Sequence, residues 1–325
     1  MAPRHNGNEG GYTSPSGCFG AFSDTSNRVS FACAVFFFLA LLGISVASFL
    51  VRKKTRAGKQ LLGGFYIVAV LFYLLGSASS IVVAVLLGCT ATTDENYYGW
   101  VITASVLVGF ARYLLLVVFL LTLNDMFRKH FGGKSHIFRL ICAILFLMGV
   151  LTVSNIALQG QVLKLQATYS GNRSYSSVEV LGDRSKSLNV AYWSLYFFSV
   201  LVAGVLSVVS TFSMRSRRQP GGALLSWVVA LTSSMFIWTL IALIRSIDYI
   251  RFMLTDWRGV VASDFILDLF VVLSFVILMM IAKHRAWNGK STDTVELHDL
   301  ASEQPVGIPQ DHTHQGTATK QPPSY

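Results

Sequence analysis

Residues 261–282 read VASDFILDLFVVLSFVILMMIA, a run that is apolar apart from two aspartates and two serines. A helix rises about 1.5 Å per residue and the hydrocarbon core of a bilayer is about 30 Å thick, so about 20 apolar residues are enough to cross it. Six runs of comparable length precede this one, which predicts an all-α bundle of seven transmembrane helices. The predicted spans begin near Phe31, Leu61, Trp100, Ile137, Asn189, Ala223 and Val261, and they end near Val51, Leu87, Leu123, Leu158, Met214, Leu243 to Ile247 and Ala282.

The composition of the chain indicates the same class. Hydrophobic residues make up 53% of the 325 residues and charged residues 13%, whereas soluble domains average about 25% charged residues. The net charge of +10 is also a feature of nucleic-acid-binding proteins, but here the basic residues gather in short clusters between the apolar runs. Nucleic-acid-binding proteins instead carry their basic residues along one face of the molecule. We therefore predict that membrane lipids surround the protein and that it has no nucleic-acid partner.

The positions of lysine and arginine predict the orientation, because cytosolic loops of membrane proteins carry an excess of both. Basic clusters follow the first, third, fifth and seventh predicted spans, so the N-terminus is predicted outside and the C-terminus in the cytosol. Residues 1–30 are predicted to be an extracellular tail, 31–282 the transmembrane domain and 283–325 a disordered cytosolic tail. The plasma membrane is the expected location. The clusters are Arg52, Lys53, Lys54, Arg56 and Lys59; Arg128, Lys129, Lys134 and Arg139; Arg215, Arg217 and Arg218; and Lys283, Arg285 and Lys290.

Two further features fall in segments that this topology places outside. Asn172, Arg173 and Ser174 form an N-glycosylation acceptor sequence, although so short a pattern also occurs by chance. Cys18 and Cys89 are the two cysteines outside the apolar runs, and a disulfide between them is a hypothesis.

Few charges lie at the depth of the membrane, where each is costly and needs a partner or a role. Arg112 lies near the middle of the third span, and Asp268 lies about two turns inside the seventh, with Asp264 one turn nearer its outer end. Arg245 and Asp248 lie at the outer end of the sixth span. These residues predict either a ligand-binding polar pocket or ion pairs that lock helices together. We favour a functional role for Arg112 and Asp268, with Arg112 binding an anionic group or pairing with Asp268, and a structural role for the other three, since they lie near the lipid headgroups.

Several residue types are missing from the predicted spans. No histidine lies in any of them, so a haem or a histidine-bound metal in the membrane has no ligands there. No lysine lies in any of them, which excludes a retinal Schiff base. We predict no cofactor and no enzymatic activity. Proline is also missing, which predicts helices without proline kinks.

Small and hydroxyl-bearing residues gather in two of the predicted spans, at 76–80 (Gly-Ser-Ala-Ser-Ser) and at 232–234 (Thr-Ser-Ser). Small residues let membrane helices approach closely, and hydroxyl groups form hydrogen bonds between helices. We therefore predict helix packing, and not a ligand site, at both positions.

The chain ends in Pro322, Pro323, Ser324 and Tyr325, a Pro-Pro-x-Tyr motif. Such motifs bind the aromatic groove of WW domains as a polyproline II segment. The motif therefore predicts a WW-domain ubiquitin ligase as a partner of the cytosolic tail.

Arg245 and Ser246 close the sixth predicted span, a short outer loop follows, and Asp268 lies in the seventh. This stretch, from Ile244 to Asp268, resembles part of the fungal lipid-translocating exporter-like family, seven-helix proteins associated with resistance to toxic lipids and sterol-active compounds. The family usually carries an arginine and a glutamate where this chain has Tyr249 and Phe252, and a glutamate in its second helix that this chain lacks. The resemblance implies a seven-helix fold and movement of a lipid-like molecule.

Three functions are consistent with these features. We favour a multi-pass membrane protein that binds or translocates a small amphipathic or lipid-like molecule, with Arg112 and Asp268 as its polar centre. The first alternative is a receptor-like sensor that signals through its cytosolic loops. The second is a membrane-embedded enzyme of lipid or terpenoid metabolism that acts through Asp264 and Asp268.

Overall fold

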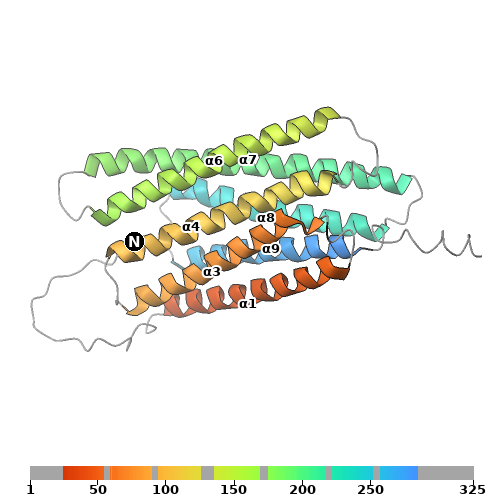
Figure 1. The fold of residues 1–325 in the computed structure, drawn as a ribbon. Helices are drawn as coiled ribbons and strands as arrows, with labels where there is room; N and C mark the ends of the chain where they lie inside the picture. The colour runs from red at the N-terminus through yellow and green to blue at the C-terminus, as the bar shows by residue number, and fades with distance from the viewer. Residues whose placement is uncertain are drawn as a thin grey trace, which may run out of the picture. The chain divides into compact units, whose positions relative to one another are not determined.

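The structure, a computed structural model, describes residues 25–54, 59, 61–89, 94–125, 135–168, 175–216, 222–251 and 257–284. All elements in these ranges are helical (Figure 1). Seven of the described helices are long and apolar enough to cross a membrane, which confirms the prediction, and the chain is a multi-pass membrane protein. The helices are α1 (Thr25–Lys54), α3 (Gly64–Cys89), α4 (Asp94–Val117) with its continuation η1 (Val118–Leu123), α6 (Ser135–Thr168), α7 (Tyr175–Ser216), α8 (Gly222–Arg251) and α9 (Trp257–Lys283).

Several helices are longer than the apolar runs that predicted them. α7 begins at Tyr175, well before the predicted start near Asn189. Its first turns were not predicted because they are polar and carry Asp183 and Lys186. These two side chains form an ion pair one turn apart, with 3.2 Å between Nζ and Oδ1. A search for apolar runs misses such an extension, because charged residues form helices outside the hydrocarbon core as readily as apolar ones. The segment between the fourth and fifth spans is therefore much shorter than predicted.

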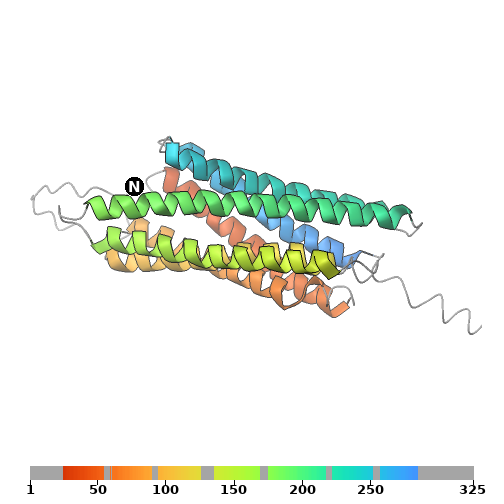
Figure 2. The same ribbon diagram turned by 90° about the horizontal axis from the view of Figure 1, so that it is seen from above.

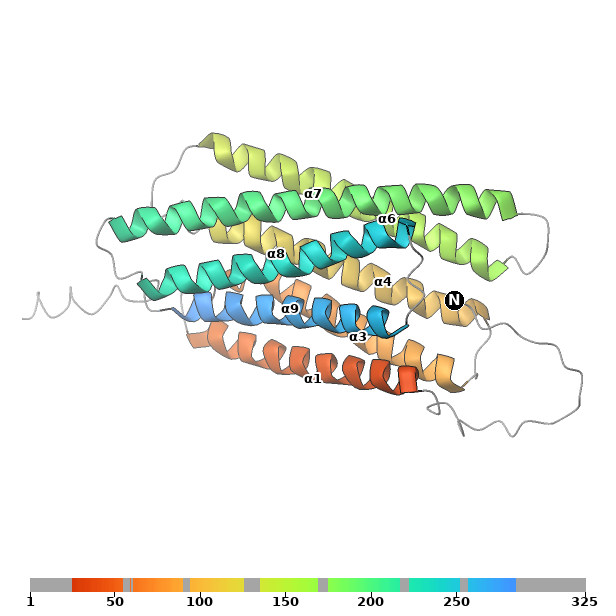
Figure 3. The same ribbon diagram turned by 180° about the vertical axis from the view of Figure 1, so that it is seen from behind.

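The helices form a ring in chain order. Each of α1, α3, α4, α6, α7, α8 and α9 packs against the next, and α1 packs against α9 to close the ring. Figure 2 shows the helices running alongside one another in a single bundle, and Figure 3 shows α9 beside α1 on the side hidden in Figure 1. All these helices belong to one compact unit, residues 1–288. Consecutive helices run in opposite directions, so the end of the bundle where α1 begins is the predicted outer end.

One helix departs from regular α geometry although its span has no proline. Residues 118–123 form the π-helix η1 at the end of α4. The side chain of Asn124 donates a hydrogen bond of 2.8 Å from Nδ2 to the backbone oxygen of Leu120, which satisfies a carbonyl group at this irregular turn. η1 packs against α6 and α7. The absence of proline from this span therefore does not exclude a local departure from α geometry.

The small residues pack helices together, as predicted. A Cβ atom added to Gly76 would lie 2.6 Å from Cγ2 of Val108, so the backbone of α3 lies close against α4. A Cβ atom added to Gly204 would lie 2.3 Å from Cγ2 of Thr232, which shows the same close approach between α7 and α8. Ser234 on α8 donates a 2.9 Å hydrogen bond to the backbone oxygen of Phe270 on α9. Close approach and interhelical hydrogen bonds are the usual means of stabilising helix pairs in lipid.

On α4, α7 and α9 buried side chains begin at a similar depth, whereas on α8 they extend further toward the predicted outer end, to Ser246. Along the described part of α4 the first buried residue from the predicted outer end is Ala111, along α7 it is Tyr192, and along α9 it is Leu267. From this depth to the predicted cytosolic end the interior is closed by fully buried side chains, among them Leu116 and Phe275. The predicted cytosolic half of these helices is therefore tightly packed, and the outer half is more accessible.

Candidate functional site

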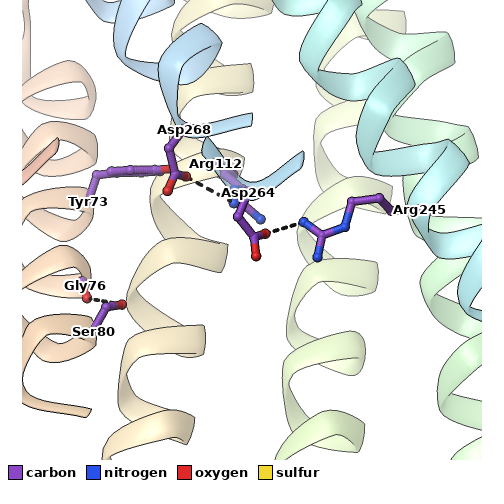
Figure 4. A network of polar contacts seen from close by, with 7 residues as sticks. All are labelled: Tyr73, Gly76, Ser80, Arg112, Arg245, Asp264 and Asp268. Atoms are coloured by element: carbon purple, nitrogen blue, oxygen red, sulfur yellow. Dashed lines mark hydrogen bonds and ion pairs between the residues drawn. The ribbon is translucent and has the colours of Figure 1, made fainter. Parts of the chain in front are cut away.

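A polar layer lies at the depth where burial begins. Its members are Tyr73 on α3, Arg112 on α4 and Asp268 on α9 (Figure 4). Tyr73 donates a hydrogen bond of 2.6 Å from its hydroxyl to Oδ1 of Asp268. The guanidinium Nη2 of Arg112 lies 4.0 Å from the same carboxylate oxygen. The structure thus brings together Arg112 and Asp268, the two residues for which the sequence favoured a functional role.

The close packing of α3 on α4 places Tyr73 beside Arg112. Gly76 lies one turn from Tyr73 and faces Val108, which lies one turn from Arg112 on the antiparallel partner helix. A larger side chain at Gly76 would push these helices apart and separate the two polar residues. Ser80, one further turn along α3, donates to the backbone oxygen of Gly76 within its own helix (Figure 4). It is therefore not part of the polar layer.

Arg112 has an unusual set of partners. Its Cζ lies 5.8 Å from the centroid of the Trp193 ring, within range of a cation–π interaction. Its backbone oxygen accepts a 2.8 Å hydrogen bond from the hydroxyl of Tyr196. Its Nε atom is buried and has no hydrogen-bond partner in the described part of the chain. The contact with Asp268 at 4.0 Å is an ion pair and is too long for a hydrogen bond.

An aromatic cluster supports the α7 side of the layer. It consists of Tyr192, Trp193 and Tyr196 on α7 and Trp238 on α8, all of them buried. Trp238 packs against Tyr196 with 5.2 Å between ring centroids and against Trp193 with 5.9 Å. Edge-to-face contacts of this kind fix the orientation of the rings. The Trp193 face that Arg112 approaches is therefore held in place by its neighbours.

The two charged side chains of the layer are partly accessible in spite of their depth. The side chain of Arg112 is 23% exposed and that of Asp268 is 36% exposed, whereas Tyr73 is 2% exposed. Part of each charged side chain is therefore available for contact with a bound molecule.

A second ion pair lies nearer the predicted outer end. Arg245 on α8 pairs with Asp264 on α9, one turn from Asp268 (Figure 4). Both side chains are partly exposed, at 28% and 56%. Four of the five charged residues that the sequence singled out therefore form two pairs, one inside the other along α9. The two pairs interact electrostatically, because the charges of Arg245 and Asp264 also act on Asp268. Asp248, the remaining predicted member, lies in α8, but its side chain is outside the described residues.

The structure adds residues that the sequence did not single out. Tyr73 is the direct hydrogen-bond partner of Asp268, and Trp193 is the aromatic partner of Arg112. Both lie within long apolar runs, where tyrosine and tryptophan are ordinary core residues. One signal was available: Tyr66 and Tyr73 lie two turns apart on α3, so both hydroxyl groups project from one face of an apolar helix. The hydroxyl of Tyr66 donates a 3.0 Å hydrogen bond to the backbone oxygen of Phe275 on α9.

A separate pocket of about 280 Å³ lies at the predicted cytosolic end. The residues that line it include Leu61 and Tyr66 near the start of α3, Thr122 in η1 and Phe138 in α6. The lining is mainly apolar. The π-helix therefore contributes directly to the wall of this pocket.

The other predicted sites lie outside the described residues. These are Asn172 of the glycosylation sequence, Cys18 of the proposed disulfide and the terminal Pro322, Pro323 and Tyr325; the side chain of Cys89 is also not described. Cys33 and Cys142 are free cysteines. Among the described side chains no group of three or more His, Cys, Asp or Glu residues is placed to hold a metal ion.

Comparisons with known proteins found no match to this chain among family models, curated proteins or solved structures. The resemblance to the lipid-translocating exporter-like family thus stays a prediction from the residues between Ile244 and Asp268.

Proposed function

We propose that this protein binds or translocates a small amphipathic or lipid-like molecule, with Arg112 and Asp268 as the polar centre that receives its headgroup. The observation that carries the proposal is the buried Nε of Arg112, which has no partner among the described residues although it lies in the middle of a membrane span. A charge at this depth is costly unless it has partners. A ligand that supplies hydrogen-bond acceptors to Arg112 would offset that cost.

The surroundings of the layer favour an amphipathic ligand. The polar side chains are few and converge on one depth, while the membrane-spanning parts of the surrounding helices just outside the layer are mainly apolar and less buried. Binding sites for small molecules usually combine a mainly apolar lining with a few polar groups that fix orientation. A headgroup at Arg112 would place an apolar chain along the outer halves of the helices.

Cellular accumulation of a fluorescent lipid tests the proposal. Cells that lack the protein should accumulate more of the lipid, and the wild-type chain should restore the lower level. Arg112→Ala should not restore it at equal amounts of protein in the plasma membrane, whereas Lys186→Ala, which removes a basic residue of the polar first turns of α7 away from the layer, should restore it. Rescue by Arg112→Ala at the wild-type level would rule out Arg112 as the centre of the site.

A receptor-like function is the second candidate, and the predicted cytosolic end favours it. η1 lies next to the pocket of about 280 Å³, and π-helical turns occur frequently at functional sites. Replacement of residues 215–218 by a neutral linker should then abolish a downstream response and leave lipid accumulation unchanged. Loss of lipid clearance with no change in signalling would favour translocation instead.

An enzymatic role for Asp264 and Asp268 fits the geometry less well. The two carboxylates lie one turn apart on α9, but each has a separate partner. Asp264 pairs with Arg245, and Asp268 accepts the hydrogen bond from Tyr73. These contacts hold the two groups as members of different polar pairs, which supports a binding role for the layer.

A further inference from the structure

We infer that Asp268 takes up one proton when an anionic headgroup binds Arg112, so that ligand binding at the polar layer is coupled to protonation. The inference rests on the proposed function, since it concerns the same site. It also assigns the ligand to a chemical class, namely amphiphiles with one negatively charged headgroup, such as a carboxylate, phosphate or sulfonate.

The charges around Asp268 balance before a ligand binds. From α4, Arg112 lies 4.0 Å away, and from α8, Arg245 contributes the second positive charge and pairs with Asp264. From α3 the only titratable neighbour described near Asp268 is Tyr73. α1 also packs on α9, and it presents the apolar ring of Phe37 to this part of α9, 5.3 Å from Phe265. Among the described side chains, two arginines and two aspartates therefore form a neutral set within the membrane.

A bound anion disturbs this balance. An anionic headgroup on Arg112 would leave three negative charges facing two positive ones in a medium where uncompensated charge is costly. Uptake of one proton from water by the carboxylate of Asp268 restores neutrality. The proton forms an O–H bond on Asp268, no bond of the ligand breaks, and the ligand replaces Asp268 as the counterion of Arg112.

The geometry selects Asp268 for this role over Asp264. Asp268 is the carboxylate next to Arg112, so it is the group that a competing anion displaces. Its hydrogen bond from Tyr73 survives protonation, because the hydroxyl of Tyr73 still has a carboxyl oxygen to donate to. Asp264 is more exposed and keeps its own cation, Arg245, throughout. Its charge is therefore compensated whether or not the ligand is bound.

Titration of binding against pH tests the inference. The probe is a fluorescent twelve-carbon alkylsulfonate, whose headgroup stays ionised over the range used. The full-length protein is placed in phosphatidylcholine nanodiscs, and Kd is measured from pH 5.5 to pH 8.5. If binding requires protonated Asp268, Kd should rise about tenfold for each pH unit above the pH at which Asp268 loses its proton.

The variants separate the contributions of the charged residues. Asp268→Asn mimics the protonated side chain, so its Kd should be independent of pH and at pH 8.5 at least about tenfold lower than that of the wild type. Arg245→Gln combined with Asp264→Asn removes the outer ion pair without changing the net charge of the set, so this double variant should keep the pH dependence of the wild type. Arg112→Gln should lose binding at every pH. Size-exclusion chromatography and thermal unfolding check that each variant is folded.

The outcomes distinguish the inference from the proposed function. Binding that needs Arg112 but does not vary with pH, or an unchanged pH dependence in Asp268→Asn, would overturn proton uptake by Asp268 and leave the proposed function standing. No binding by the wild type, or equal binding by Arg112→Gln, would overturn the proposed function itself.

Unlabelled dodecylsulfonate should displace the probe and methanesulfonate at the same concentration should not. Displacement by both would show that a free anion suffices and would overturn the assignment to amphiphiles.

Discussion

Substitution of Tyr73 by phenylalanine tests the geometry of the polar layer most directly. The variant removes one hydroxyl group and keeps the ring, which packs edge-to-face on Phe275 at 6.2 Å. The lost interaction is the 2.6 Å hydrogen bond to Asp268, which lies at the depth of the membrane. Hydrogen bonds to charged groups contribute about 1.5–3 kcal/mol, so Tyr73→Phe should lower the free energy of unfolding by that amount at pH 7.5.

A double-mutant cycle isolates this interaction from other effects of the substitution. Tyr73→Phe is measured in the wild type and in Asp268→Asn, by equilibrium unfolding in mixed detergent micelles. In the Asn background the hydroxyl has a neutral partner, and its loss should cost only about 0.5–1.5 kcal/mol. The coupling energy between Tyr73 and Asp268 is the difference between these two losses and should therefore be about 1 kcal/mol.

A matched control is available at Tyr113, whose hydroxyl donates a 3.2 Å hydrogen bond to the backbone oxygen of Leu145. Tyr113→Phe removes the same atom from a neutral hydrogen bond, so it should cost about 0.5–1.5 kcal/mol and show no coupling to Asp268→Asn. If Tyr73→Phe cost no more than Tyr113→Phe and its coupling to Asp268 were below about 0.5 kcal/mol, the polar layer would not be held together as described.

Three further substitutions test other parts of the molecule. Gly204→Ala should lower the free energy of unfolding by about 1–3 kcal/mol, because the new Cβ would meet Thr232 at 2.3 Å. Adding Thr232→Ala to the same chain should recover most of this loss. No recovery would show that the contact with Thr232 is not its cause. Arg245→Ala should change the free energy of unfolding by less than about 1 kcal/mol, since the pair with Asp264 is partly exposed, and a larger loss would contradict a weak, solvent-screened pair. Tyr325→Ala should weaken the binding of a tail peptide to an isolated WW domain by at least about tenfold in a fluorescence titration, because the tyrosine belongs to the docking motif; unchanged affinity would exclude the terminal motif as the ligand.

The arrangement of the layer also limits which functions the bundle supports. The interior between the layer and the predicted cytosolic end is closed by buried side chains such as Leu116, Phe119 and Leu278. A molecule bound at Arg112 would therefore need a rearrangement of these helices to pass further. A translocating protein must undergo such a change, whereas a receptor only needs to transmit a smaller shift to its cytosolic end. The pH titration and the lipid accumulation assay address these steps separately.

The amino-acid sequence by itself determined the class of the protein and the number of its spans. Long apolar runs dominate the free energy of transfer into lipid, and this term depends on composition and length and not on which residues touch. The sequence also singled out Arg112 and Asp268, with Arg112 either binding an anionic group or pairing with Asp268, because charges at this depth are costly without a partner. It predicted the packing role of Gly76 and Ser234, since small and hydroxyl residues are used for this purpose in lipid. The polar first turns of α7 were missed, because they lie outside the apolar run.

Only the tertiary structure decided which faces of the helices meet. The spans are apolar on all sides, so their sequence pattern does not reveal which side faces the interior. Three features depend on the rotation of each helix about its axis: the hydrogen bond of Tyr73 to Asp268, the cation–π contact of Arg112 with Trp193, and the separate pairing of Arg245 with Asp264. That rotation is set by the summed packing of many side chains along neighbouring helices, which is a property of the assembled bundle and not of any single segment.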